Sequence, residues 1–207
     1  MYIPNHFKEE NEQVLLEFIR KNSFATLVTA ANALPAATHI PVELEENAQG
    51  KFVLRGHVSK ENAHSQAIVE GEAALMIFQG PHAYVSSGWY GHLNVPTWNY
   101  MAVHVYGRLK PMGSEDLYES LKRLADRYEE GRENKISVER MPEDFVSKMM
   151  QGVTGFEMSI EQMQGNFKLS QNRKKEDYST IISRLEKEAA AGAHQVAQEM
   201  KKIKHRK

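Results

Sequence analysis

The sequence contains no cysteine, and this absence excludes several classes of chemistry. Disulfide bonds, catalytic thiolates, iron–sulfur clusters and the common cysteine-based zinc sites all depend on that residue. A chain without disulfides fits the cytoplasm, and residues 1–7 lack the basic and apolar regions of a secretory signal. We therefore expect a cytoplasmic protein.

Long apolar runs and a strong excess of charge are missing as well. No segment offers the roughly 20 apolar residues that a membrane span needs, so we expect no membrane contact. With 26 basic and 27 acidic residues, the formal net charge of −1 gives no global attraction to nucleic acid. At 207 residues, 41% of them hydrophobic, the chain is long enough for one substantial core.

Familiar catalytic and nucleotide-binding motifs are also absent. The chain has no Gly-x-Gly-x-x-Gly, no Gly-x-x-x-x-Gly-Lys-Ser/Thr and no Gly-x-Ser-x-Gly. The common dinucleotide, nucleoside triphosphate and serine hydrolase classes therefore have no support. Nine histidines are present without a His-Glu-x-x-His or similar pair, so we expect no metal site. Ligation of haem by one histidine stays open as an alternative.

What the sequence does contain is a series of short strand patterns. Alternating or continuously apolar segments predict strands at residues 24–29, 36–44, 51–58, 73–78, 97–109 and 153–163, with a turn near Asn32. The strands follow one another without regular intervening helices, which argues against a doubly wound sheet. The pattern predicts a mainly β protein, a closed antiparallel barrel or a strongly curled sheet with peripheral helices.

Helical spacing of apolar residues accounts for most of the remaining chain. It predicts helices at residues 11–20, 114–128, 142–149 and from 176 to the C-terminus. We expect two parts: a barrel domain with inserted helices at residues 1–175, and a C-terminal helix with a basic tail at residues 176–207.

The best candidate for an anion site follows the third predicted strand. Arg55 and His57 leave the same face of that strand, and Ser59 is predicted to cap a short helix at residues 60–69. Lys60 and the first backbone N–H groups of the helix would then lie at the strand end. Arg, Lys and free N–H groups all suit phosphate. The alternative is a solvated strand edge followed by a capped helix.

Two further segments are candidates for binding. Both tryptophans, Trp89 and Trp98, lie in a stretch of residues 80–104 that Gly and Pro interrupt, which predicts an aromatic loop at a ligand site or subunit contact. Just beyond the last predicted strand, Lys168, Ser170 and Gln171 offer several hydrogen-bond donors. The alternatives are a hydrophobic plug for the first segment and an ordinary turn for the second.

Two charged clusters are interpreted as solvent-exposed. Glu43, Glu45 and Glu46 stand at a predicted polar turn, where solvated charge is the usual outcome. The basic tail at residues 201–207 has the composition of a frayed helix end, favoured by the helix dipole. Contact of this tail with DNA phosphates remains the alternative.

With these residues in view, the chain resembles the PaiB family of flavin-binding-type split-barrel proteins, described as negative transcriptional regulators of protease synthesis and sporulation. The resemblance begins at residues 1–7 and extends to about residue 190. It rests on Thr38-His39-Ile40-Pro41, Gly56-His57-Val58, Gly80-Pro81-His82-Ala83-Tyr84, Val95-Pro96-Thr97-Trp98-Asn99-Tyr100 and Lys168-Leu169-Ser170-Gln171-Asn172-Arg173.

The resemblance implies a six-stranded antiparallel split β-barrel, a homodimer with sites at the subunit interface, and FMN as cofactor. It implies that Arg55, His57 and Lys60 hold the FMN phosphate, and Ser59 beside them is a further cofactor-binding residue. The remaining cofactor-binding residues would be Trp89, Trp98, Lys168, Ser170 and Gln171. The alternative function is an FMN-dependent oxidoreductase or a haem-handling protein on the same scaffold, in which the cofactor carries the redox chemistry.

Overall fold

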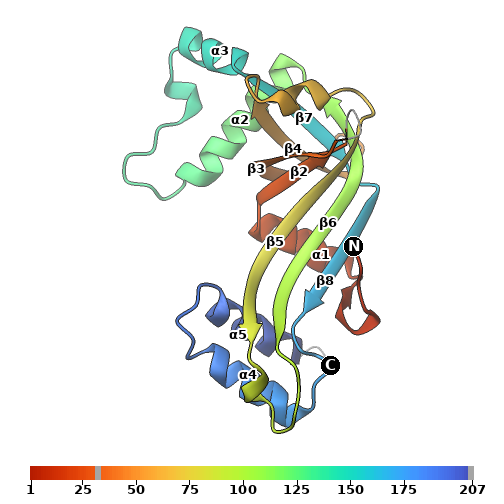
Figure 1. The fold of residues 1–207 in the computed structure, drawn as a ribbon. Coiled ribbons are helices and arrows are strands. Elements are labelled where there is room, and N and C mark those ends of the chain that lie inside the picture. The colour runs from red at the N-terminus through yellow and green to blue at the C-terminus, as the bar shows by residue number, and fades with distance from the viewer. Residues whose placement is uncertain (31–33, 205–207) are drawn as a thin grey trace. The chain divides into compact units, whose positions relative to one another are not determined.

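The computed structural model describes residues 1–30 and 34–204 (Figure 1). The turn expected near Asn32 lies outside these residues. The chain divides into two compact units. Unit 1 comprises Met1–Phe18, Phe78–His104 and Gln164–Lys207, and unit 2 comprises Ile19–Ile77 and Val105–Met163. The domain boundary expected at residue 175 lies inside unit 1, and a separate C-terminal domain stays a prediction.

Six strands pair in a ring in unit 2. They are β2 (Phe24–Thr29), β3 (Ala36–Glu46), β4 (Phe52–Ser59), β7 (Val153–Ser159), the first part of β5 (Ala73–Val85) and the last part of β6 (Thr97–Pro111). The pairing order is β6-β5-β2-β3-β4-β7, and β7 pairs in turn with β6, which closes the ring. This ring, with its mainly antiparallel pairing, confirms the predicted fold class.

Alternation along the strands gives this ring a buried face. Leu54 of β4 lies opposite Leu44 on one side and Met158 on the other, and Leu54, Phe156 and Met158 have no exposed surface. A Cβ at Gly56 would lie 3.0 Å from the ring of Phe156. The same alternation turns the odd-numbered residues of β4 toward the opposite face, where the polar side chains gather.

Helices of unit 2 follow the ring strands. α2 (Ser114–Glu129) packs against β7 so closely that a Cβ at Gly155 would meet the side chain of Leu117 at 2.7 Å. A short η5 (Val138–Arg140) and α3 (Glu143–Gln151) come next. The helix predicted at residues 60–69 is wrong: only one 3-10 turn forms, η3 (Ala63–Ala67), and its cap is Asn62 rather than Ser59.

Unit 1 contains β1 (Lys8–Glu9), most of β8 (Gln162–Lys168) and the remaining parts of β6 and β5, paired in the order β1-β8-β6-β5. The first part of α1 (Glu12–Lys21) and two C-terminal helices, α4 (Lys175–Leu185) and α5 (Ala193–Lys204), complete it. Its fully buried side chains include Leu169, Ile181, Leu185, Val196 and Met200.

Two predicted elements are each divided in the structure. The strand expected at residues 153–163 is two strands, β7 and β8, because the backbone at Glu161 turns and donates to the carbonyl of Tyr106. The helix expected from residue 176 onward breaks before α5. Gly192 at this break has φ 85°, and a Cβ there would lie 2.8 Å from the carbonyl oxygen of His82, so only glycine fits.

Candidate cofactor site

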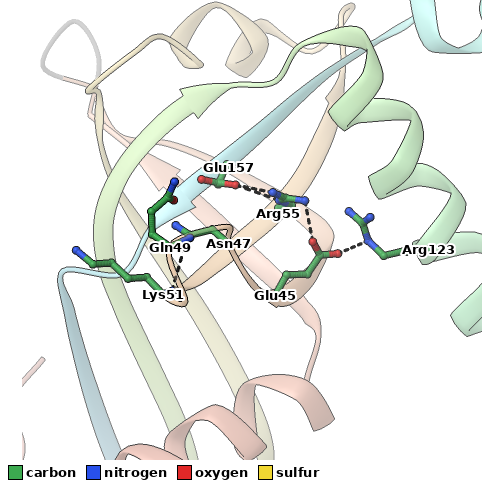
Figure 2. Close-up of polar contacts among 7 residues, drawn as sticks. All are labelled: Glu45, Asn47, Gln49, Lys51, Arg55, Arg123 and Glu157. Atoms are coloured by element: carbon green, nitrogen blue, oxygen red, sulfur yellow. Dashed lines mark hydrogen bonds and ion pairs between the residues drawn. The ribbon is translucent and has the colours of Figure 1, made fainter.

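Arg55 of β4 is held by carboxylates from two neighbouring strands (Figure 2). Its Nε and Nη2 groups donate to Oε2 of Glu157 on β7 at 3.1 and 2.9 Å, and its Nη1 donates to Oε2 of Glu45 on β3 at 2.8 Å. Glu45 in turn accepts from Nε of Arg123, which reaches from α2, at 2.5 Å. The Arg55 side chain is 17% exposed. Its charge is therefore already compensated, and a phosphate would have to compete with two carboxylates.

Glu43 lies beside this network, and its position shows that the predicted solvent exposure of this residue is wrong. Glu43 and Glu45 belong to β3, which extends to Glu46, so they do not sit in a solvated turn. Only 7% of Glu43 is exposed, and its Oε2 atom makes no hydrogen bond with the described residues. Burial raises the pKa of Glu43, and the neighbouring charge of Glu45 raises it further. The sequence pattern marks this face of β3 as polar and therefore predicts solvated carboxylates, whereas α2 packs over it and places Arg123 against Glu45.

His57 follows Arg55 on the same face of β4. It lies directly opposite Gly155 of β7, close to where α2 packs. Burial lowers the pKa of His57. A neutral imidazole is thus favoured near pH 7, and this removes one of the positive charges expected to attract phosphate.

The backbone donors after Ser59 are also engaged. The N–H of Lys60 donates to the carbonyl of Gly152 at 2.9 Å, and the N–H groups of Glu61 and Asn62 donate to Oγ and the carbonyl of Ser59. The N–H groups of His64 and Ser65 both donate to Asn62. A free helix N-terminus is therefore absent from this described segment. What remains is the exposed side chain of Lys60, which lines a cavity of about 730 Å³ with residues of α2, η5 and α3.

The second predicted cluster, after β8, is a rigid turn. Ser170 is buried with φ 61°, and its Oγ donates to Oδ1 of Asn99 at 3.0 Å. The side chain of Gln171 folds back: its Oε1 accepts from the N–H of Leu169, and its Nε2 donates to the carbonyl of Phe167. Ser170 and Gln171 thus fix the shape of the turn, while Lys168 is left to bind.

Lys168 and Arg173 lie at the two ends of this turn. Nζ of Lys168 donates to Oγ1 of Thr97 at 2.5 Å. The guanidinium of Arg173 lies over the ring of Tyr90, 5.1 Å from its centroid. Burial lowers the pKa of Lys168, and the positive charge of Arg173 lowers it further. Lys168 and Arg173 thus stand five residues apart in the sequence, each held by an uncharged partner.

The aromatic segment of unit 1 is partly exposed. Trp98 is 53% exposed and Tyr84 48%, and their rings meet edge to face with centroids 5.8 Å apart. Leu93 and Val95, in the loop before β6, are fully and largely exposed. Trp89 ends the 3-10 turn η4 (Ser87–Trp89) and is half-buried. The tryptophans thus differ: Trp98 presents its ring to solvent on a strand, and Trp89 belongs to the loop.

The nine predicted residues are divided between the two units. Arg55, His57, Ser59 and Lys60 belong to unit 2, whereas Trp89, Trp98, Lys168, Ser170 and Gln171 belong to unit 1. Within unit 2 the structure pairs Arg55 with Glu45, ten residues away, and with Glu157, 102 residues away. Arg123 joins this network through Glu45. Among the described residues no group of three or more His, Asp or Glu side chains is arranged to hold a metal ion.

Comparison with known proteins gives one family and several relatives. Residues 1–162 match the family model described as "Putative FMN-binding domain". The chain is 37% identical over 200 residues to "Protease synthase and sporulation protein PAI 2" of Bacillus subtilis, covering 97% of this chain and 96% of that protein. It is 29% identical over 227 residues to the uncharacterized protein AN0679 of Emericella nidulans, with 90% of each covered.

Solved structures of similar fold include two proteins at low sequence identity. The FAD and heme binding protein from Mycobacterium smegmatis superimposes with a TM-score of 0.62 at 16% identity, covering 84% of this chain and 79% of that one. The flavocytochrome Anf3 from Azotobacter vinelandii gives 0.63 at 14% identity, covering 86% and 78%. At these identities the likeness shows a shared fold.

Proposed function

The chain belongs to the FMN-binding domain family and is a homologue of the Bacillus subtilis protein PAI 2, and from this premise we propose that it is a PaiB-type negative transcriptional regulator of protease production and sporulation. The observation that carries the proposal is 37% identity extending over 97% of the chain. Such coverage includes both compact units, so the proposal concerns the whole polypeptide. The absence of cysteine supports a cytoplasmic location.

FMN is the cofactor that this proposal includes, and the side chains present suit it. A flavin needs cations for its phosphate and aromatic or apolar surface for its ring system. Lys168 is a cation without a carboxylate partner in the described chain, and Tyr84 and Trp98 are exposed aromatic side chains of the same unit. We assign the predicted cofactor-binding role to Lys168, Trp98 and Trp89, with Ser170 and Gln171 shaping the turn. When bound, FMN would supply electron-transfer chemistry.

The predicted residues of unit 2 are less suited to bind the phosphate. Arg55 is engaged by Glu45 and Glu157, His57 is favoured as neutral, and Ser59 uses its Oγ for a backbone N–H. Lys60 keeps an exposed amino group. Of the four residues predicted there, Lys60 alone has a charge that no described carboxylate compensates.

A homodimer is the second part of the proposal. Tyr84, Leu93, Val95 and Trp98 leave an aromatic and apolar surface exposed on unit 1. A surface of this kind is costly in water and is typical of a contact between subunits. A second copy of the same chain would cover it symmetrically.

Contact with DNA would be the means of repression, and the described part of the basic tail gives it limited support. Lys201 pairs with Glu186, and Nζ of Lys202 lies 2.6 Å from Glu199. These lysines are thus partly neutralised.

No helix in the described residues is long and apolar enough to cross a membrane.

The proposal is tested by titrating the purified protein with FMN while following flavin fluorescence, and by a mobility shift with operator DNA from a protease gene. We expect saturable FMN binding near one flavin per chain, and DNA binding that weakens as salt rises. Deletion of residues 201–207 decides whether the tail contributes. A protein that binds neither FMN nor DNA would overturn the proposed function.

A further inference from the structure

The turn between β8 and α4 carries two positive charges that nothing in the described chain neutralises. Lys168 and Arg173 each lack an ion pair with any carboxylate among residues 1–30 and 34–204. This contrasts with Arg55, Arg108 and Arg123, which all lie against glutamates. Two cations on one short turn, with no carboxylate to compensate them, offer charge-assisted hydrogen bonds to an anion.

Each of the two side chains is held in place by an uncharged partner. Nζ of Lys168 bonds to Oγ1 of Thr97, the first residue of β6. Arg173 stacks on Tyr90, which is only 8% exposed. A hydroxyl and an aromatic face position a cation without cancelling its charge. The positive charges therefore remain available to a ligand.

The backbone between the two cations is equally fixed. Ser170 adopts the left-handed conformation and is anchored to Asn99, and the N–H of Arg173 donates to the carbonyl of Ser170 at 3.0 Å. Because the side chains of Ser170 and Gln171 form hydrogen bonds that fix this turn, the backbone that carries Lys168 and Arg173 has its shape before any ligand binds. Such preorganisation lowers the cost of binding.

Asp177, four residues after Arg173 in the sequence, forms its contacts with the aromatic loop and not with either cation. Asp177 of α4 is buried and accepts from the N–H of Gly91 at 3.0 Å, and its other oxygen lies 3.4 Å from Nδ1 of His92. Beside it, the hydroxyl of Tyr90 is buried without a hydrogen-bond partner among the described residues. Asp177 thus anchors the aromatic loop, and the Tyr90 ring under Arg173 carries a hydroxyl that no described residue bonds.

We propose that Lys168 and Arg173 together bind the phosphate monoester of the cofactor. Arg173 is thereby added to the cofactor-binding residues predicted from the sequence. This inference rests on the proposed binding of FMN. Arg173 supplies a planar fork that matches two phosphate oxygens, and Lys168 supplies a compact charge beside it. A phosphate dianion in this position relieves the repulsion between the two cations.

The test compares FMN with riboflavin, which has the same ring system and no phosphate. Dissociation constants are measured by flavin fluorescence for the wild-type chain and for Arg173→Gln and Lys168→Met. The matched control is Lys174→Met, since Lys174 is exposed, lies next to Arg173 and has no side-chain role in capping α4. Thermal unfolding of each variant verifies that it is folded, and Arg173→Lys keeps the charge where Arg173→Gln is unstable.

We expect each of the two variants to weaken FMN binding by about tenfold or more and to leave riboflavin binding within about twofold. Inorganic phosphate should compete with FMN for the wild-type chain and no longer do so for the variants. FMN binding that is unchanged in both variants would overturn the inference while leaving the proposed cofactor intact. An equal loss for FMN and riboflavin would also overturn it, because the residues would then act on the ring system or the fold. A wild-type chain that binds no FMN removes the cofactor itself, which the variants alone cannot do.

Discussion

Arg55 donates through Nε and Nη2 to a single oxygen of Glu157, at 3.1 and 2.9 Å, across the β4–β7 pair. The two residues are 102 positions apart in the sequence. The register of β4 and β7 places them directly opposite one another. With Glu45 on the other side, Arg55 ties three neighbouring strands of the ring together.

Replacing Arg55 by Gln should lower the free energy of unfolding by roughly 2 kcal/mol, because it leaves Glu45 and Glu157 half-buried with less compensation. Chemical denaturation measures this change. The control is Arg108→Gln, whose pair with Glu161 is more than half exposed and should cost less than about 1 kcal/mol. Equal losses in the two variants would contradict a structural role specific to Arg55.

Glu43→Gln should stabilise the protein at neutral pH, by about 1 kcal/mol. The pKa of Glu43 is raised by burial and by Glu45, against the opposing attraction of Arg123, Arg127 and Arg55. The folded state therefore binds this proton more tightly than the unfolded state, so ionisation of Glu43 costs stability as pH rises through the raised pKa.

The gain from Glu43→Gln should accordingly be full above that raised pKa and fall away as pH drops through 4.5, the ordinary value for this carboxyl, because Glu43 then becomes neutral in both states. Thermal unfolding between pH 4 and pH 8 checks the profile, with Glu46→Gln as the exposed control on the same strand. A destabilised Glu43→Gln variant at pH 7 would mean that attraction by the three arginines outweighs burial.

Trp98→Glu should convert the proposed homodimer into a monomer, because it places a charge on the exposed surface that Trp98 forms with Tyr84. Sedimentation velocity of the wild-type and variant chains gives the answer. Phe145→Glu is the matched control, since Phe145 of α3 is 48% exposed in unit 2. A wild-type chain that sediments as a monomer, or a dimer unaffected by Trp98→Glu, would refute the assignment of this surface.

Ser170→Gly should leave the protein about 1 kcal/mol more stable than Ser170→Ala, although both lose the hydrogen bond to Asn99. The reason is the φ of 61° at this position, which glycine adopts freely and alanine does not. In an ordinary backbone conformation the order would be reversed. Urea denaturation of the two variants measures the difference, and an alanine variant as stable as the glycine variant would contradict the left-handed turn.

Short-range patterns accounted for most of the fold. Alternation of apolar residues predicted β2, β3, β4 and β6 within a few residues of their observed ends. It could do so because successive side chains of a strand point to opposite faces, so that the pattern depends only on neighbouring residues. The helix at residues 60–69 failed for a local reason as well. Asn62 competes with Ser59 for the cap, and the N–H groups that follow are used within the turn.

The sequence by itself determined which residues form most of the ring strands. Tertiary structure alone decided the electrostatic state of those residues. Glu43 and Glu45 look like solvated charge until β4 brings Arg55 and α2 brings Arg123 beside them. The physical reason is distance along the chain: strand propensity acts between neighbours, whereas burial and ion pairing depend on strand register and helix packing between residues up to about a hundred positions apart.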